Sequence, residues 1–158
     1  MIVKFKKLHE DAVLPSYANF GDAGADLVTV TDGQYARSVE GEDLWYYIEY
    51  KLGFAVEIPD FHVGLIFPRS SISKSSLSLA NAIAVIDSSF RGEVSLRFKI
   101  DYGTVMDAYG LDLPPARYKK GDKIAQLIIV PIPAFCPIWS DELSVTARGT
   151  KGWGSSGT

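Results

Sequence analysis

The segment Val94-Ser95-Leu96-Arg97-Phe98-Lys99-Ile100 decides the fold class of this chain. Its apolar side chains alternate with a serine, an arginine and a lysine, which is the two-residue period of a strand with one buried face. Other short apolar runs recur between glycine, proline, aspartate and asparagine, the usual turn residues. These runs are Ile2–Phe5, Leu44–Tyr50, Phe54–Ile58, Val63–Phe67, Ala82–Ile86 and Ile124–Val130. The sequence therefore predicts an all-β domain, either a sandwich or a jelly roll.

Three segments depart from the strand pattern. Ser71–Leu79 is compatible with a short helix, although its serines argue against a long one. Thr31–Glu42 is polar and contains glycines, and Tyr102–Lys120 carries two glycines and two adjacent prolines. We expect both to leave the core as surface excursions, either as extra hairpins or as contacts with a partner.

The composition limits the class of protein. The chain has 158 residues, of which 47% are hydrophobic and 22% charged, as in one ordinary globular domain. A net charge of −3 argues against a nucleic-acid polymer as partner, because such proteins present a basic face. Without a membrane-length apolar run or a signal peptide, we expect no membrane contact and a cytoplasmic location, or the host cytoplasm for a viral or phage chain. One cysteine and two histidines exclude an internal disulfide and a cysteine or histidine metal cage.

Three segments carry polar side chains in turns or strands where they could bind a ligand. Gly21–Leu27 (GDAGADL) puts small neighbours around Asp26, which permits close approach of a ligand or of metal-bound water. Pro68–Ser71 sets an arginine and two hydroxyls at a strand end, which suits phosphate oxygens. Gly121–Ile128 runs into an apolar strand interrupted by Gln126, an amide that needs partners if buried. Each segment alone also fits an ordinary turn or a backbone bridge.

The segment Asn81–Glu93 carries the strongest catalytic signal. An apolar strand runs straight into Asp87, and a carboxylate at the end of a buried strand is held rigidly enough to orient a water molecule. Phe90 follows across a serine turn, where an aromatic ring could cover a sugar. The alternative is that Asp87 caps the turn and Phe90 belongs to the core.

The last eleven residues, Arg148–Thr158, favour neither a helix nor a buried strand. Their glycines and hydroxyls leave backbone N–H groups free, Arg148 suits a phosphate, and Trp153 can stack on a base. This composition predicts a flap that closes over a nucleotide, and the alternative is a disordered terminus.

The order and spacing of these segments resemble the trimeric dUTPase family (deoxyuridine triphosphate nucleotidohydrolases). The five family motifs stand in order from Asp22 to the C-terminus as DAGADL, PRSS, AVIDSSFRGE, GDKIAQLI and RGTKGWGSSGT. The resemblance implies a jelly-roll-like β-barrel of the dUTPase type over residues 1–147, a mobile nucleotide-closing tail over residues 148–158, and a homotrimer with shared active sites. It also implies Mg²⁺-assisted hydrolysis of dUTP to dUMP and pyrophosphate, which limits uracil in DNA and supplies dUMP for dTMP synthesis.

The same resemblance assigns roles to individual residues. Asp87 would activate the water that attacks the α-phosphate, Phe90 would exclude a 2′-hydroxyl, and Asp26 would hold Mg²⁺ through water. Uracil would be recognised by the Asn81–Val85 hairpin, including Asn81 and Val85, and by stacking on Trp153. The remaining substrate-binding residues are Arg69, Ser70, Ser71, Gln126, Arg148, Gly154, Ser155 and Ser156. Such a reaction needs no covalent nucleophile, in agreement with a chain that offers no Cys/His or Ser/His pair.

The chain departs from the family pattern at four positions. Ala84, Ser89, Phe90 and Trp153 stand where the family commonly has glycine, aspartate, tyrosine and phenylalanine. Phe90 keeps a ring but loses a phenol, Trp153 enlarges the stacking face, and Ala84 adds a methyl group to the uracil hairpin. We expect these changes to bear on rate and selectivity more than on reaction class.

Two other functions agree less well with the sequence. The related dCTP deaminases depend on a glutamate seven residues after the phenylalanine, and that position is Arg97 here. A regulatory or binding protein with the dUTPase fold would be favoured by loss of Asp87 or of the tail, and both are present. The sequence therefore favours a dUTPase over either alternative.

Overall fold

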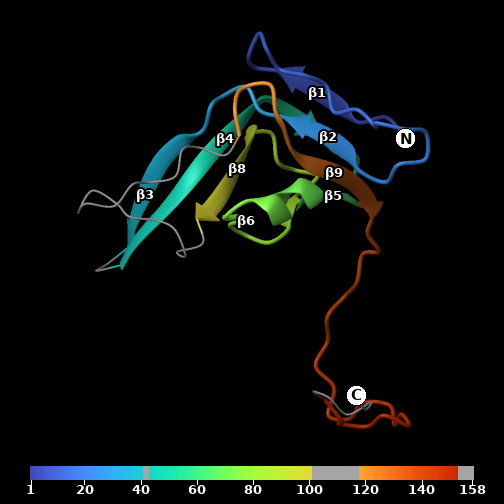
Figure 1. Ribbon diagram of the computed structural model, residues 1–158. Coiled ribbons are helices and arrows are strands. Elements are labelled where there is room, and N and C mark those ends of the chain that lie inside the picture. The colour runs from blue at the N-terminus through green and yellow to red at the C-terminus, as the bar shows by residue number, and fades with distance from the viewer. Residues whose placement is uncertain (41–42, 101–117, 153–158) are drawn as a thin grey trace.

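The computed structural model describes residues 1–40, 43–100 and 118–152, and these residues form two antiparallel sheets (Figure 1). The strands are β1 (Lys4–Lys7), β2 (Ala25–Val28), β3 (Gln34–Glu40), β4 (Asp43–Glu57), β5 (His62–Pro68), β6 (Leu77–Leu79), β7 (Ala84–Ile86), β8 (Glu93–Ile100) and β9 (Lys123–Pro131), and a 3-10 helix, η1 (Ser70–Lys74), follows β5. One sheet has the order β1-β4-β8-β6, with β3 paired to β4, and the other has the order β2-β9-β5-β7. The all-β prediction is confirmed for the described residues, none of whose helices is long and apolar enough to span a membrane.

Strand β8 has the predicted alternation, and its apolar face forms the centre of the core. Val94, Leu96, Phe98 and Ile100 are buried, whereas the residues between them are half-buried or exposed. The fully buried ring of Phe98 packs against Tyr50 and Tyr118, with ring centroids 5.6 and 5.7 Å away. Leu27, Ile66 and Leu127 of the other sheet are buried in the same core, so apolar packing joins the two sheets.

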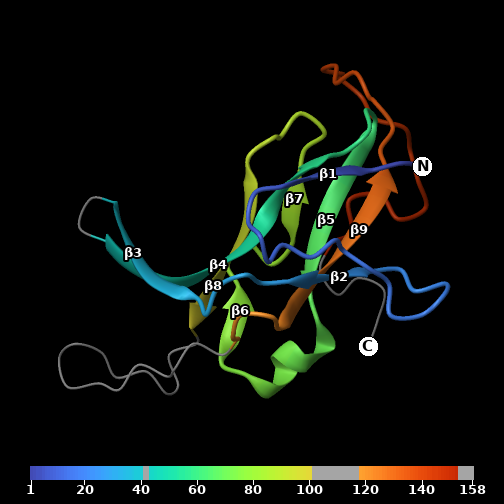
Figure 2. The same cartoon turned by 90° about the horizontal axis from the view of Figure 1, so that it is seen from above.

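The first expected excursion, Thr31–Glu42, is mostly a strand. β3 pairs with β4 from Gln34 opposite Glu49 to Glu40 opposite Asp43, so this segment is a hairpin that projects from the body (Figure 2). The two apolar runs expected as separate strands before and after Gly53 belong to the single strand β4. The pairing of β4 with β8 shifts at this glycine, whose φ is +69°, so it marks a bulge rather than a strand end.

The segment Ser71–Leu79 contains both a helix and a strand. Only its first part is helical, as η1, and β6 follows after Ser75. Of the second expected excursion, Tyr102–Lys120, residues 102–117 lie outside the described residues. The rest of it, from Tyr118, leads into the turn before β9.

The chain beyond β9 runs away from both sheets (Figure 1). Its large apolar side chains are exposed in this single chain, with Trp139 fully so. They are Ile132, Phe135, Ile138, Trp139, Leu143 and Val145. A soluble chain rarely leaves so many large apolar groups uncovered, so this segment has the composition of a contact with another protein surface.

The aromatic centre of the core gives a stability prediction. Phe98→Ala should lower the free energy of unfolding by about 3–5 kcal/mol, because it removes a buried ring and leaves a cavity. Arg97→Ala, on the exposed face of the same strand, should cost about 1 kcal/mol or less. Urea denaturation at one fixed protein concentration measures both losses. Equal losses for the two variants would contradict the packing described here.

Candidate functional site

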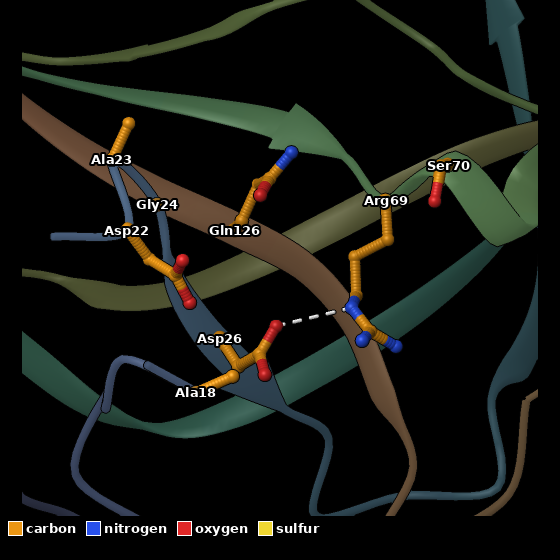
Figure 3. A pocket seen from close by; sticks show the side chains of 8 residues that line it. All are labelled: Ala18, Asp22, Ala23, Gly24, Asp26, Arg69, Ser70 and Gln126. Carbon is orange, nitrogen blue, oxygen red and sulfur yellow. Dashed lines mark ion pairs between the residues drawn. The ribbon is translucent and has the colours of Figure 1, made fainter. Parts of the chain in front are cut away.

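A pocket of about 330 Å³ lies where β2, β9 and the end of β5 meet (Figure 3). It is lined by Ala18, Asp22, Ala23, Gly24, Asp26, Arg69, Ser70 and Gln126. Four of these residues, Asp26, Arg69, Ser70 and Gln126, were predicted as site residues from three segments far apart in the sequence. The structure therefore brings three of the predicted segments to one pocket.

The pairing of β9 with its two neighbours sets this arrangement. Asp26 on β2 is opposite Gln126 on β9, and Gln126 is opposite Phe67 on β5, just before Pro68 and Arg69. The turn before β9 is fixed to the buried Thr29, which donates its N–H to the Asp122 carbonyl at 3.0 Å. Backbone pairing thus brings Gln126 of β9, Asp26 of β2 and the end of β5, just before Arg69, to the same place on the sheet.

Two cations hold the Asp26 carboxylate. The side chain of Asp26 is only 10% exposed, and its Oδ1 lies 3.0 Å from Arg69 Nε (Figure 3). Its Oδ2 lies 2.8 Å from Lys123 Nζ, an ion pair rather than an aligned hydrogen bond. A nearly buried carboxylate needs such partners, because an unpaired buried charge is costly. Lys123 was missed from the sequence, since only the β2–β9 register brings it to Asp26.

Gly24 leaves room for the Gln126 side chain. A Cβ at this glycine would lie 3.0 Å from the Gln126 Cβ and 2.6 Å from its Oε1, and the second distance is closer than real side chains approach. The amide Nε2 donates to the Pro68 carbonyl at 3.3 Å, so Gln126 does bridge to backbone as one sequence interpretation held. Gly24 of GDAGADL therefore serves close packing in the pocket wall.

Asp87 and Phe90 lie in a second place, at the turn between β7 and β8. Asp87 directly follows β7 and is exposed, and the Phe90 N–H donates to its carbonyl at 3.0 Å. Phe90 is 40% exposed as a residue, so the interpretation of Phe90 as core is wrong. Neither residue lines the pocket around Asp26.

The pairing register of the sheet gives the separation between the pocket around Asp26 and the turn that carries Asp87. Ile86, next to Asp87, is opposite Gly64 on β5, which is opposite Ile129 on β9. Ile129 is three residues along β9 from Gln126, which is about 10 Å at the rise of a strand. One chain therefore presents the pocket and the exposed carboxylate at separate positions on its surface.

The predicted uracil hairpin is the turn between β6 and β7. Ala82 has a φ of +56°, in the left-handed region that a residue with a side chain adopts at a cost, and its N–H donates to the Leu79 carbonyl at 3.0 Å. Asn81 and Val85 are exposed beside it. Ala84 is buried in the core, so the methyl group that departs from the family pattern packs inward.

The remaining predicted residues do not line the pocket. Ser71 is half-buried in η1, and Arg148 lies in the exposed segment after β9, where its Nε donates to the Lys151 carbonyl at 3.0 Å. Arg97, which was not predicted as a site residue but stands where the deaminases have their glutamate, pairs with Glu49 at 3.2 Å. Four more predicted residues lie outside the described part of the chain: Trp153, Gly154, Ser155 and Ser156.

Two antiparallel sheets with a surface pocket of carboxylate, guanidinium and amide groups define an all-β domain with a polar pocket at the end of one sheet. The chain belongs to the dUTPase family, whose model matches residues 10–157. A deoxyuridine 5'-triphosphate nucleotidohydrolase of Thermobifida fusca is 34% identical over 157 residues, covering 98% of this chain and 78% of that protein.

Solved structures agree with this membership. The dUTPase of Staphylococcus bacteriophage 80alpha with dUPNHPP superposes with a TM-score of 0.76 at 27% identity, covering 99% of each chain. A mutant dUTPase from phage phi11 of Staphylococcus aureus, which carries a structural Mg(II) ion, gives a TM-score of 0.60 at 26% identity over 93% of this chain and 97% of that one. The expected jelly-roll-like fold of the dUTPase type is thereby confirmed.

The two ion pairs of Asp26, with Arg69 and with Lys123, give a stability prediction. Arg69→Met or Lys123→Met alone leaves one cation on Asp26, so each variant should lose little stability. The double variant should lose about 3 kcal/mol or more, since it leaves a buried carboxylate unpaired. Adding Asp26→Asn should restore most of that loss. Urea denaturation of the five proteins, wild type included, checks this. Additive losses without rescue by Asp26→Asn would mean that the two cations act independently.

Proposed function

We propose that this protein hydrolyses dUTP to dUMP and pyrophosphate. The observation that carries the proposal is the pocket in which three family segments meet, with Asp26, Arg69 and Gln126 in contact or in register. Such a reaction would limit uracil in DNA and supply dUMP for dTMP synthesis. The cytoplasmic location expected from the sequence stays a prediction.

The pocket suits a triphosphate but does not carry a surplus of positive charge. Arg69 and Ser70 offer a guanidinium and a hydroxyl to phosphate oxygens, as their residue types favour. The cations of Arg69 and Lys123 are balanced by the carboxylates of Asp22 and Asp26, so the cluster is neutral overall. Binding a highly charged triphosphate therefore calls for further cations, and we assign that role to Mg²⁺ and to Arg148.

The described residues fit a magnesium ion that arrives with the substrate. Among them, no group of three or more histidine, cysteine, aspartate or glutamate side chains is placed to hold a metal ion. Both oxygens of Asp26 are already paired with cations, which leaves this carboxylate suited to a metal-bound water rather than to the metal itself. When bound, Mg²⁺ would neutralise charge on the phosphate oxygens, and it usually keeps several of its waters.

Asp87 is the proposed general base. Its place directly after β7 fixes the backbone, and its exposure leaves the carboxylate free to accept a proton from a bound water. The water oxygen forms a bond to the α-phosphorus, its proton passes to Asp87, and the bond from the α-phosphorus to the bridging oxygen breaks. Pyrophosphate leaves with that oxygen, and no covalent enzyme intermediate forms.

Sugar and base recognition is assigned to the two turns beside β7. The half-exposed Phe90 offers an apolar face to a deoxyribose, and in this proposal its ring would exclude a 2′-hydroxyl. The exposed Asn81–Val85 hairpin offers backbone groups and an amide to the uracil edge. The tail, residues 148–158, would close over the bound nucleotide, with Trp153 stacked on the base and Ser155 and Ser156 on the phosphates.

The separation of Asp87 from the pocket supports an active site shared between chains. Within one chain the two positions differ by about 10 Å along the sheet, before the strands between them are counted. The exposed apolar segment after β9 also needs a surface to cover it. We therefore propose a homotrimer in which each site combines Asp87 of one chain with the pocket of another.

The catalytic role of Asp87 is tested by Asp87→Asn. Hydrolysis of dUTP with Mg²⁺ should fall by at least about 10²–10⁴-fold, the usual contribution of a positioned base. Asp60→Asn, which removes an exposed carboxylate from the turn between β4 and β5, is the matched control and should keep wild-type activity. Pyrophosphate release measures the rate, and an assay for ammonia from dCTP tests the deaminase alternative. Wild-type turnover by Asp87→Asn would refute the assignment.

The shared site is tested by mixing two inactive variants. Asp87→Asn and Arg69→Ala should each be inactive alone. Random mixed trimers should recover about a quarter of the wild-type activity, because a site then needs its base from one variant and its pocket from the other. Co-expression with two affinity tags verifies subunit exchange. If the mixed trimers form and stay inactive, each site is built within one chain.

A further inference from the structure

The ring of Phe90 lies against Gly92, two residues further along the chain. A Cβ built at Gly92 would lie 2.7 Å from Phe90 Cζ, 3.0 Å from Cε2 and 3.6 Å from Cε1. Contacts under 3.0 Å are essentially absent from real side chains, so the ring occupies the space that a side chain would need. The outer end of the ring therefore has its present position only because residue 92 is glycine.

The backbone conformation at residue 92 does not require a glycine. Among the described glycines with a positive φ, Gly92 does not appear, so alanine could adopt its backbone conformation. The close approach of the Phe90 ring is the feature that excludes a side chain here. Gly92 thus differs from Gly121 in the turn before β9, whose φ is +92° and whose Cβ would meet nothing within 4 Å.

The surrounding turn leaves the ring as the part that must move. The Phe90 N–H donates to the Asp87 carbonyl, and Arg91 Nη1 donates to the Phe90 carbonyl at 2.8 Å and also to the Ser88 carbonyl. On the other side, Glu93 pairs with Ala55 at the start of β8. Both ends of the turn are held by hydrogen bonds. A methyl group at residue 92 would therefore clash with the half-exposed Phe90 ring, and the ring would rotate away to relieve the clash.

We propose that Gly92 is a positioning residue, which sets the place of the Phe90 ring and through it the preference for a deoxyribose over a ribose. This inference rests on the proposed hydrolysis of dUTP, in which Phe90 packs against the sugar. Gly92 itself needs no contact with the substrate. A displaced Phe90 ring would either clash with the sugar or lose contact with it. Substitution of Gly92 should therefore change substrate binding and selectivity rather than the rate of the chemical step.

The test is a double-mutant cycle between residues 92 and 90. Gly92→Ala should lower kcat/KM for dUTP roughly tenfold or more, mainly through KM, and should narrow the ratio of efficiencies for dUTP and UTP. In a Phe90→Ala background the same substitution should change neither quantity by more than about twofold, because the ring through which it acts is gone. Ser88→Ala, which alters a side chain in the same turn without adding a Cβ, is the control and should keep the wild-type ratio.

Two results would overturn the inference. One is a wild-type dUTP/UTP ratio in Gly92→Ala, and the other is an undiminished effect of Gly92→Ala when Phe90 is already alanine. Thermal unfolding and gel filtration of each variant distinguish a loss of selectivity from a loss of fold or assembly.

A spectroscopic measurement separates this inference from the proposed function. One α-proton of Gly92 points at the Phe90 ring, so its NMR resonance in glycine-labelled protein should carry a ring-current shift that disappears in Phe90→Ala. A protein that fails to hydrolyse dUTP but shows this shift would refute the proposed function and leave the contact intact. An unchanged resonance in Phe90→Ala would refute the positioning of the ring by Gly92, whatever the activity.

Discussion

The arrangement of the site depends on the register of β9 between β2 and β5. This strand pairs with both neighbours, and it aligns Gln126 with Asp26 on one side and with Phe67 on the other. Side chains alternate between the faces of a sheet, so a slip of one residue would turn Gln126 to the opposite face and separate Lys123 from Asp26. The turn before β9, bonded to the buried Thr29, opposes such a slip. Register here is a condition for binding as well as for folding.

Local patterns in the sequence predicted the amphipathic strands correctly but missed strands that depend on their partners. The alternation in Val94–Ile100 is a property of one strand, and it predicted the buried face of β8 correctly. The polar segment Thr31–Glu42 has no such alternation, and it becomes β3 because β4 offers a long edge to pair with. Gly53 signalled a strand end and instead marks a bulge, since the pairing strand continues on both sides of it. Tertiary pairing overrode the local signal in both places.

The site shows the same division between residue types and geometry. The order and spacing of the predicted segments were enough to select their polar residues. One pocket does bring together an arginine, a serine, a glutamine and an aspartate from these segments. The second cation on Asp26 was not recognisable, since a lysine after a turn is ordinary until the β2–β9 register places it. Nor could order along the chain reveal that Asp87 lies away from that pocket. Such distances are set by the sheet, which the linear sequence does not state.

The apolar segment after β9 has a consequence for how the protein is made. During synthesis it emerges from the ribosome after every described strand, so the two sheets can begin to form before these side chains reach water. A nascent chain thus does not expose this apolar segment to water while its strand edges are still unpaired. If the proposed homotrimer covers this stretch, a released chain is open to aggregation until it assembles, and assembly would be fastest where chains are made close together, for example on one message.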